Sequence, residues 1–198
     1  MGLKLIGVTG KARSGKDTVA TILVEEHGFV RTAFADPLKQ AAAILFDWPP
    51  ELAFSDSIKE HLSPFWNMTG REIMQKFGTE AMRGTFGEDF WVKRWVTEYA
   101  RLSPKHSIVV SDVRTDTEAN AIRDLGGIIV HLRRDSAGLA GAEALHSSEA
   151  GIKFDKASDI WVDNNGTVAD LVDEAHRLIA FVETEASRLG FRNVKIEQ

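Results

Sequence analysis

The sequence of 198 residues contains no cysteine, which excludes disulfide bonds and thiolate metal sites and fits a reducing compartment. No apolar run approaches the roughly 20 residues that a helix needs to cross a membrane. A strand-like segment begins within the first few residues, which leaves no room for a signal peptide. We therefore expect a cytoplasmic protein that has no membrane partner.

Positive charge is also scarce overall, because 24 Lys and Arg stand against 29 Asp and Glu, for a formal net charge of −5. This balance argues against binding to a nucleic-acid polymer, which depends on neutralising many phosphates. Arginines nevertheless recur beside the motifs described below, at positions 13, 71, 83, 114, 133 and 134. Arginines that gather beside motifs in an acidic chain suit the binding of a small, highly charged ligand. The alternative is that they belong to a solvated surface of mixed charge.

The chain shows no internal repeat, low-complexity tract or linker, and its length suits one domain over residues 1–198. Strand-like and helix-like segments alternate along it. The strand candidates are 4–9, 30–34, 107–111, 128–132 and 160–162, and the helix candidates are 17–26, 37–46, 70–77, 88–101, 116–125 and 168–188. This alternation predicts an α/β fold in which helices cover both faces of a parallel sheet and ligands bind at the carboxyl ends of its strands.

The clearest motif follows the first strand. Gly10, Gly15 and Lys16 fit the phosphate-loop pattern G-x-x-x-x-G-K, in which backbone N–H groups and the lysine hold a polyphosphate. A glycine-rich turn between strand and helix is the alternative. The next residue is usually Ser or Thr, whose hydroxyl binds Mg²⁺, but here it is Asp17, and Thr18 comes one place later. A carboxylate at this position can hold the metal through a water molecule, and the Thr18 hydroxyl can then meet the α-phosphate.

Two segments interrupt the alternation of strands and helices. Residues 36–101 insert several helices between the second and third strands, and residues of about 134–158 form a long connection rich in Gly, Ala and Ser. Long connections in compact domains are usually functional or disordered. We interpret the first segment as an acceptor-binding insert and the second as a lid that excludes water, with a plain flexible loop as the alternative to the lid.

An apolar strand that ends in Asp112 has the form of a metal-binding element. If this strand lies beside the first one, Asp112 comes close to Lys16 and can bind Mg²⁺ directly or through water. Arg114 would then point into the same cleft. Without the phosphate loop, Asp112 would read as a turn residue.

The helix predicted over 70–77 separates its side chains by type. Arg71 and Gln75 are i,i+4 neighbours on one face, and Ile73 and Phe77 occupy the opposite, core-facing side. The guanidinium and the amide suit a phosphate and a base or sugar, although a solvated helix face explains the same pattern. Further along, Trp91 could stack on a base, but its place at the edge of an apolar helical stripe favours core packing.

Two groups near the carboxyl ends of later strands complete the candidate site. Arg133 and Arg134, where the fourth strand meets the lid, are candidates for binding the transferred phosphate. Within the lid, residues 146–149 form a dense polar group that ends in Glu149. This group is a candidate for substrate binding, and capping of a following helix is the alternative. After the last strand, residues 165–167 form a turn and a helix cap at the same edge of the sheet.

These residues together resemble a known family, the phage-type deoxynucleoside monophosphate kinases, with the animal-type phosphomevalonate kinases as a related neighbour. The resemblance covers most of the chain, and both families use Gly-Lys-Asp, so Asp17 supports it. The stretch Gln75 to Arg83 resembles the deoxynucleotide enzymes more closely. The motifs that carry the resemblance are Arg13-Ser-Gly-Lys-Asp17, 34–39, Gly78-Thr-Glu80 with Arg83, 89–91, Ser111-Asp-Val-Arg114, 126–127, 146–149 and Asn165-Gly-Thr167.

The resemblance implies a three-layer P-loop NTPase fold with a five-stranded parallel sheet, ATP as phosphoryl donor, Mg²⁺ and a deoxynucleoside 5′-monophosphate as acceptor. The motifs described above and the resemblance together give three groups of residues in addition to the metal-binding Asp17 and Asp112. The catalytic group is Lys16, Arg13, Asp112, Arg133 and Arg134. The donor group is Gly10, Ser14, Gly15, Lys16, Asp17, Thr18, Asn165, Gly166 and Thr167, of which 165–167 would flank the adenine. The acceptor group is Arg71, Gln75, Thr79, Glu80, Arg83, Trp91, Arg114 and Glu149.

The implied reaction fits a site rich in arginine and poor in acid/base groups. A phosphate monoester has its second pKa near 6, so the acceptor is already a nucleophile at neutral pH and needs no general base. Two alternatives remain: a kinase of another small phosphorylated molecule, such as phosphomevalonate, and a non-catalytic nucleotide switch, which would need neither insert nor lid. A phage origin, in a host cytoplasm, and a homodimer are left open.

Overall fold

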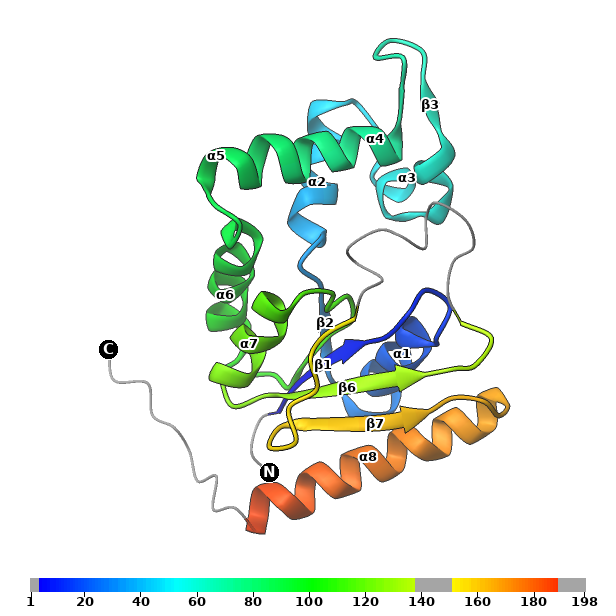
Figure 1. The fold of residues 1–198 in the computed structure, drawn as a ribbon, viewed down its shortest axis with the longest axis vertical. Helices are drawn as coiled ribbons and strands as arrows, with labels where there is room; N and C mark the ends of the chain where they lie inside the picture. Colours follow the sequence, from blue (N-terminus) through cyan, green and yellow to red (C-terminus); the bar gives the residue numbers. More distant parts are fainter. Residues whose placement is uncertain (1–3, 138–150, 189–198) are drawn as a thin grey trace. The chain divides into compact units, whose positions relative to one another are not determined.

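The computed structural model describes residues 4–137 and 151–188. The chain divides into two compact units, one formed by Met1–Thr32 with Tyr99–Gln198 and the other by Ala33–Glu98 (Figure 1). The second unit lies within a single interval of the sequence, and its limits fall close to those of the predicted insert. The helix α6 (Phe90–Leu102) runs from this unit into the first. Among the described residues, no helix is both long and apolar enough to cross a bilayer.

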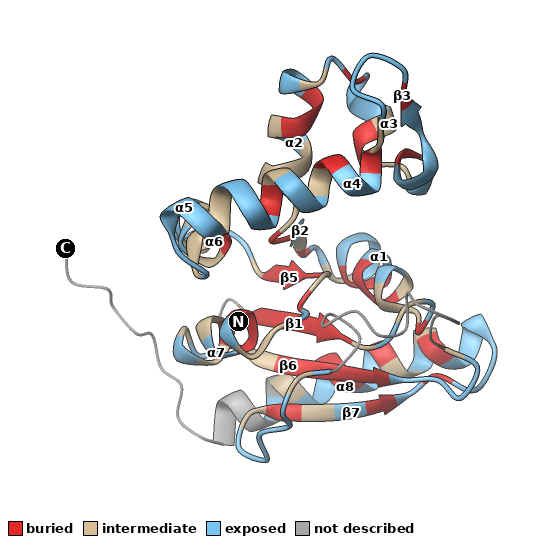
Figure 2. Cartoon of the chain, turned by 45° about the horizontal axis from the view of Figure 1, so that its top comes forward, coloured by how far each residue is buried: buried red, intermediate tan, exposed pale blue. Residues whose placement is uncertain are grey.

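A five-stranded parallel sheet forms the centre of the first unit. Its strands are β1 (Leu5–Thr9), β2 (Val30–Thr32), β5 (Ile108–Val110), β6 (Ile128–Arg133) and β7 (Asp159–Asp163), in the order β2-β5-β1-β6-β7. All five correspond to predicted strands. The inner strands β1, β5 and β6 are largely buried (Figure 2), as expected of a sheet that is covered on both faces.

Helices cover both faces of this sheet and give the unit three layers. On one face, α1 (Lys16–His27) and α8 (Val168–Arg188) pack apolar side chains such as Leu23 and Leu178 against Ile6 and Val8. Side chains alternate along a strand, so Gly7 faces the other side. There α7 (Asp116–Asp124) lies so close that a Cβ on Gly7 would come within 2.7 Å of Ile122. The predicted α/β fold is confirmed.

The second unit contains mainly helices. Its elements are α2 (Asp36–Leu45), α3 (Pro50–Phe54), the 3₁₀ helix η1 (Asp56–Glu60), the hairpin strands β3 (Leu62–Ser63) and β4 (Met68–Thr69), α4 (Gly70–Gln75), the π-helix η2 (Lys76–Arg83), α5 (Gly84–Phe86) and the first part of α6. A separate core, which includes Ala42, Trp48, Ile58 and Ile73, holds these elements together. The unit therefore has an apolar interior of its own.

The helix predicted over 70–77 is longer than expected. Helical backbone continues from Gly70 through the π-helical turns of η2 to Phe86. The glycine at position 78, which would weaken an isolated helix, lies close to α2: a Cβ on Gly78 would come within 2.7 Å of the Leu38 side chain. The local sequence pattern does not show this close approach of two helices.

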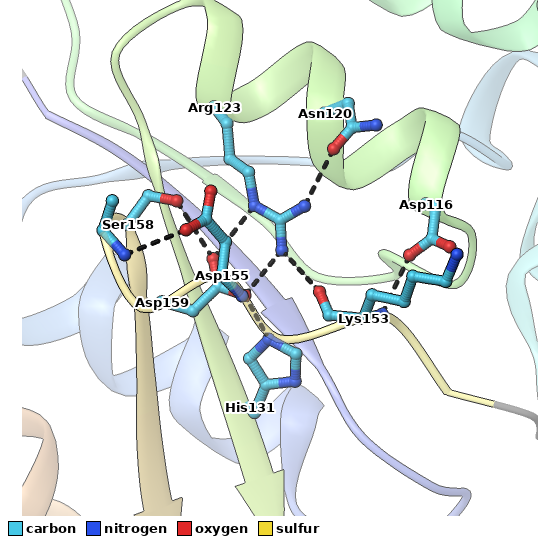
Figure 3. Close-up of polar contacts among 9 residues, drawn as sticks. Asp116, Asn120, Arg123, His131, Lys153, Asp155, Ser158 and Asp159 are labelled. Carbon is cyan, nitrogen blue, oxygen red and sulfur yellow. Dashed lines mark hydrogen bonds and ion pairs between the residues drawn. The ribbon is translucent and has the colours of Figure 1, made fainter.

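A buried carboxylate connects the edge strand β7 to the rest of the unit (Figure 3). Asp159 pairs with Arg123 of α7 through two contacts, Nε to Oδ1 at 3.0 Å and Nη2 to Oδ2 at 2.5 Å. His131 Nε2 on β6 lies 2.7 Å from the same Oδ2, and the backbone N–H of Asp155 donates to it at 2.9 Å. Burial opposes ionisation, but the hydrogen bonds from Arg123, Asp155 and His131 outweigh it and hold the pKa of Asp159 below its usual value.

The same arginine fastens the segment that follows the predicted lid. Arg123 donates from Nη2 to the carbonyl of Lys153 at 3.0 Å, and the N–H of Lys153 donates to Asp116 at 2.8 Å (Figure 3). Arg123 and Asp116, the two side chains that contact Lys153, both belong to α7. The described end of the lid region, residues 151–158, is therefore attached to the sheet and helix core of its unit.

We predict that Asp159→Asn lowers the free energy of unfolding by about 3 kcal/mol at pH 7, because it leaves the largely buried Arg123 cation without its partner. The folded pKa is depressed, so the stabilisation is present above the usual Asp pKa of about 3.9 and is lost as pH falls through the folded value. Urea unfolding at steps from pH 7 to pH 3 measures this.

The matched control is Asp163→Asn on the same strand, whose carboxylate is exposed. Its loss at pH 7 should be much smaller. Equal losses in the two variants, or a loss from Asp159→Asn that does not shrink in acid, would contradict the role assigned to Asp159.

Candidate nucleotide-binding site

The loop between β1 and α1 has a backbone that only glycine can follow at two points. Gly10 and Gly15 have φ angles of 147° and 101°, in the region that favours glycine. A Cβ on Gly10 would lie 2.5 Å from the carbonyl oxygen of Leu132, and one on Gly15 would lie 2.4 Å from Asn164 Nδ2. Both glycines of the predicted pattern are therefore needed for the loop to fold tightly against the ends of β6 and β7.

Lys16 turns back over this loop. Its Nζ donates to the carbonyl oxygens of Gly10 and Lys11, each at 2.8 Å. Helix α1 starts at Lys16 and has no side-chain N-cap, so its first N–H groups lack that partner. The Ser14 hydroxyl is buried and has no hydrogen-bond partner among the described residues. A cation, helix N–H groups and a buried hydroxyl together fit a bound polyphosphate.

Asp112 lies at the same edge of the sheet as the loop. β5 pairs directly with β1, with Val110 opposite Gly7, so the neighbouring-strand condition for Asp112 is met. The N–H of Val113 donates to Val8 at 3.3 Å and keeps this segment along the sheet. Arg114 is exposed, and its N–H donates to Glu118 Oε2 at 2.8 Å.

The predicted metal ligands Asp17 and Asp112 come from different elements. Asp17 is exposed in the first turn of α1, and Asp112 is half-buried. In the described part of the chain, no three His, Asp or Glu side chains cluster in a way that could hold a metal ion by themselves. Mg²⁺ in kinases is usually held by one or two carboxylates together with substrate phosphates and water, so two carboxylates fit that mode of binding.

Arg133 and Arg134 both lie where β6 ends, but their contacts differ. Arg133 forms a bidentate pair with Asp163, Nε to Oδ1 at 2.6 Å and Nη2 to Oδ2 at 2.9 Å, and its guanidinium lies 5.8 Å from the Trp161 ring centre. The hydrogen bond to Asp163 raises the pKa of Arg133. Arg134 donates from Nε to the Ser136 hydroxyl at 3.2 Å. The pair engages the Nε and Nη2 groups of Arg133 and leaves its Nη1 donors outside this contact, so both arginines stay candidates for binding phosphate.

The turn after β7 is held by its own polar contacts. Asn165 Oδ1 accepts the N–H of Asp135 at 2.8 Å, which connects the turn to the start of the predicted lid. The hydroxyl of Thr167 accepts the N–H of Asp170 at 3.3 Å, while Thr167 donates its own N–H and hydroxyl to the Asp170 carboxylate at 2.7 Å. The predicted cap at Thr167 is thus present, and adenine contacts at 165–167 stay a prediction.

In the second unit, the helix from α4 through η2 presents most of the predicted acceptor residues on its outer side. Gln75, Thr79 and Glu80 are exposed, and Arg83 is half-buried. Arg71 is also exposed and donates to Glu60 at 3.0 Å. The π-helical turns run through this group, and π-helical turns often occur at functional sites.

Trp91 differs from the other predicted acceptor residues. Its ring is buried, and its Nε1 donates to the carbonyl of Gly78 at 2.9 Å. It also packs edge to face against Phe90, with 4.8 Å between ring centres. These contacts fit the core-packing interpretation and leave no open ring face for a base, which corrects the placement of Trp91 among the substrate contacts. Glu149, with the rest of 146–149, lies outside the described residues.

The sequence pattern did not identify two residues that shape this site. Asn164 contacts the phosphate loop, and Glu118 holds the turn that follows Asp112. Glu118 could have been found as the fourth position of a capping box that begins at Thr115. Asn164 had no such signal, since Asp-Asn-Asn-Gly reads as an ordinary turn.

We predict that Gly15→Ala weakens ADP binding at least tenfold, because the new methyl group meets the Asn164 amide and the backbone must leave its positive φ. Gly28→Ala is the control: Gly28 also has a positive φ, of 68°, but a Cβ there meets nothing within 4 Å. The control should lose stability by about 1 kcal/mol and keep its affinity. Calorimetric titration with ADP measures both variants, and unchanged affinity in Gly15→Ala would contradict the interpretation of the loop.

Comparison with known proteins gives consistent matches. The family model for deoxynucleotide monophosphate kinase matches residues 4–51 and 50–175. A protein of Acanthamoeba polyphaga mimivirus, provisionally named as a deoxynucleotide monophosphate kinase, is 32% identical over 86% of this chain and 93% of its own length. The deoxynucleotide monophosphate kinase of Enterobacteria phage T4 is 22% identical over 85% of this chain and 95% of its own length.

A solved structure supports the fold alone. Dephospho-CoA kinase from Campylobacter jejuni superposes with a TM-score of 0.54 at 15% identity, covering 91% of this chain and 98% of that one. The phosphate loop, the strand order around it and the long family match agree, and the chain belongs to the deoxynucleotide monophosphate kinase family.

Proposed function

We propose that this chain transfers the γ-phosphoryl group of ATP to a deoxynucleoside 5′-monophosphate and releases ADP and the deoxynucleoside diphosphate. The observation that carries the proposal is the extent of the family match, which includes both the phosphate loop and the whole unit Ala33–Glu98. A phosphate loop alone is compatible with many nucleotide-binding functions. We also propose that the reaction takes place in the cytoplasm.

For this reaction the protein has to position the γ-phosphoryl group of ATP and the phosphate of the acceptor, and to neutralise their negative charge. The acceptor monoester is largely dianionic at neutral pH, so one of its oxygens attacks the γ-phosphorus directly and the bond to the β–γ bridging oxygen breaks. No side chain has to remove a proton. This explains why the described candidate site contains arginines and a lysine and needs no histidine or carboxylate as a general base.

On the donor side, the loop binds the phosphates of ATP. Lys16 exchanges its contacts with the Gly10 and Lys11 carbonyls for phosphate oxygens, and the first N–H groups of α1 point at the same anion. Ser14 and Thr18 supply hydroxyls, Arg13 supplies a second cation, and residues 165–167 flank the adenine. Asp17 and Asp112 would hold Mg²⁺, which neutralises phosphate charge when it is bound.

On the acceptor side, the outer face of the helix from α4 through η2 binds the monophosphate. Arg71 and Arg83 suit its phosphate, and Gln75 suits its base or sugar. Thr79 and Glu80 continue the same exposed face. Arg114 and Glu149 complete the proposed acceptor contacts, and Arg133 and Arg134 would neutralise the transferred group.

The reaction itself is tested by an assay that couples ADP release to each of the four deoxynucleoside monophosphates. We expect acceptor-dependent ADP with at least one of them. Phosphomevalonate serves as the matched control acceptor, since it carries a phosphate but no base, and water alone measures hydrolysis. ADP release that depends on phosphomevalonate, or on no acceptor at all, would overturn the proposal.

Two substitutions distinguish the proposed phosphoryl-transfer role of Lys16 from the proposed acceptor-binding role of Arg83. Lys16→Ala should lower kcat by about 100-fold or more, because a cation on the transferred phosphate is lost. Arg83→Ala should also lower turnover, and only this variant should mainly raise the acceptor KM, by about tenfold.

Steady-state kinetics with both substrates varied measures these effects. Arg94→Ala is the control, since Arg94 lies in the same unit and pairs only weakly with Glu98, at 3.5 Å. An acceptor KM in Arg83→Ala equal to that of Arg94→Ala would refute the acceptor role of Arg83.

A further inference from the structure

We infer that Asn164 is a positioning residue that aims the Gly15 N–H group of the phosphate loop at the nucleotide phosphate. The inference rests on the proposed function in one respect, namely that this loop binds a polyphosphate. It concerns a residue outside the phosphate-loop pattern, 150 positions away from Ser14 in the sequence, which no local pattern connects to the loop.

The contacts of Asn164 fix both its backbone and its side chain. The residue follows β7 directly and is only 4% exposed. Its backbone N–H donates to the carbonyl of Arg133 at 2.7 Å, which continues the pairing of β6 with β7 by one step. Its side-chain Nδ2 donates to the carbonyl of Ser14 at 2.8 Å in a buried hydrogen bond. The side-chain amide of Asn164 therefore holds one particular peptide group of the phosphate loop, the one that contains the Ser14 carbonyl.

That peptide connects Ser14 to Gly15. In a planar trans peptide, the C=O and the N–H groups point in opposite directions. Because Asn164 holds the Ser14 C=O, the Gly15 N–H points to the opposite side, away from the turn after β7. Gly15 immediately precedes α1, so its N–H adds to the set of N–H groups at the helix start.

The fit between Gly15 and Asn164 is mutual. A Cβ at position 15 would lie 2.4 Å from Nδ2 and 3.6 Å from Cγ of Asn164, so the missing side chain makes room for the amide. An aspartate in place of Asn164 would set a carboxylate against the Ser14 carbonyl and repel it. An alanine would leave that buried carbonyl without a donor. An asparagine is thus the residue type that fills the space and supplies the donor.

The turn around Asn164 also connects the loop to the neighbouring parts of the site. Asp163 pairs with Arg133, and Asn165 accepts the N–H of Asp135. Three consecutive residues therefore contact the phosphate loop, the end of β6 and the first residues of the predicted lid. A change at position 164 acts on the loop through Ser14, while Asp163 and Asn165 keep their own partners.

The first test uses the protein without nucleotide. In ¹⁵N-labelled Asn164→Ala, the amide resonance of Gly15 should shift and its hydrogen exchange should change, because its peptide is no longer held. Titration with tripolyphosphate alone should show an affinity about tenfold weaker than that of the wild type, the effect of one misdirected charge-assisted hydrogen bond. The KM of the acceptor monophosphate should stay within about twofold.

A stability control separates positioning from general loss of structure. Ile179→Ala removes buried apolar volume from α8 in the same core and should lower the melting temperature while leaving tripolyphosphate affinity unchanged. Wild-type affinity in Asn164→Ala would overturn the inference. An equal loss of affinity in Ile179→Ala would overturn it as well, since the effect would then be structural.

Asn164→Asp keeps the shape of the side chain and provides a second test if the alanine variant does not fold. A protonated carboxyl can donate to the Ser14 carbonyl as the amide does, whereas the carboxylate cannot. Its tripolyphosphate affinity, relative to the wild type at each pH, should recover as pH falls from 8 to the usual Asp pKa of about 3.9. A ratio that stays flat would overturn the inference. Failure of the wild type to bind tripolyphosphate would instead overturn the proposed function, while the Gly15 resonance would still test Asn164.

Discussion

The tight turn of the phosphate loop against the ends of β6 and β7 is the constraint on which the candidate site depends. Two glycines with positive φ allow it, and in both cases the space a side chain would need is taken by another residue, the carbonyl of Leu132 or the amide of Asn164. The loop then passes into α1 without a side-chain cap. The first N–H groups of this helix and the Lys16 cation, which bends back over the loop, together suit an anion.

The strand order brings further candidate groups of the same unit to this loop. β1 lies between β5 and β6, so the carboxyl end of β1 is flanked by the segment of Asp112 on one side and by Arg133 and Arg134 on the other. Parallel pairing makes these ends meet at one edge of the sheet. Buried carboxylates then hold the connecting segments: Glu118 accepts from the turn after Asp112, and Asp159 holds the segment before β7.

Much of this arrangement could be predicted from local patterns. The five strands and the helices α1, α6, α7 and α8 lie close to the ranges that their sequence patterns predict. The continuation of α4 through the π-helix η2 was missed, since Gly78 weakens the local helical signal. Trp91 was open to two interpretations until its burial and its bond to Gly78 were known.

The sequence by itself determined the positions of the glycines, the lysine and the strand ends, because each depends on residue type and local spacing. The Asp17 variant of the phosphate loop and the stretch from Gln75 to Arg83 also pointed to the family from the sequence alone. Only the tertiary structure decided which distant groups complete the loop. The hydrogen bond from Asn164 to Ser14 joins residues 150 positions apart, and the ion pair of Arg123 with Asp159 joins residues 36 positions apart. Strand order and packing bring these partners together, and no local sequence pattern encodes either.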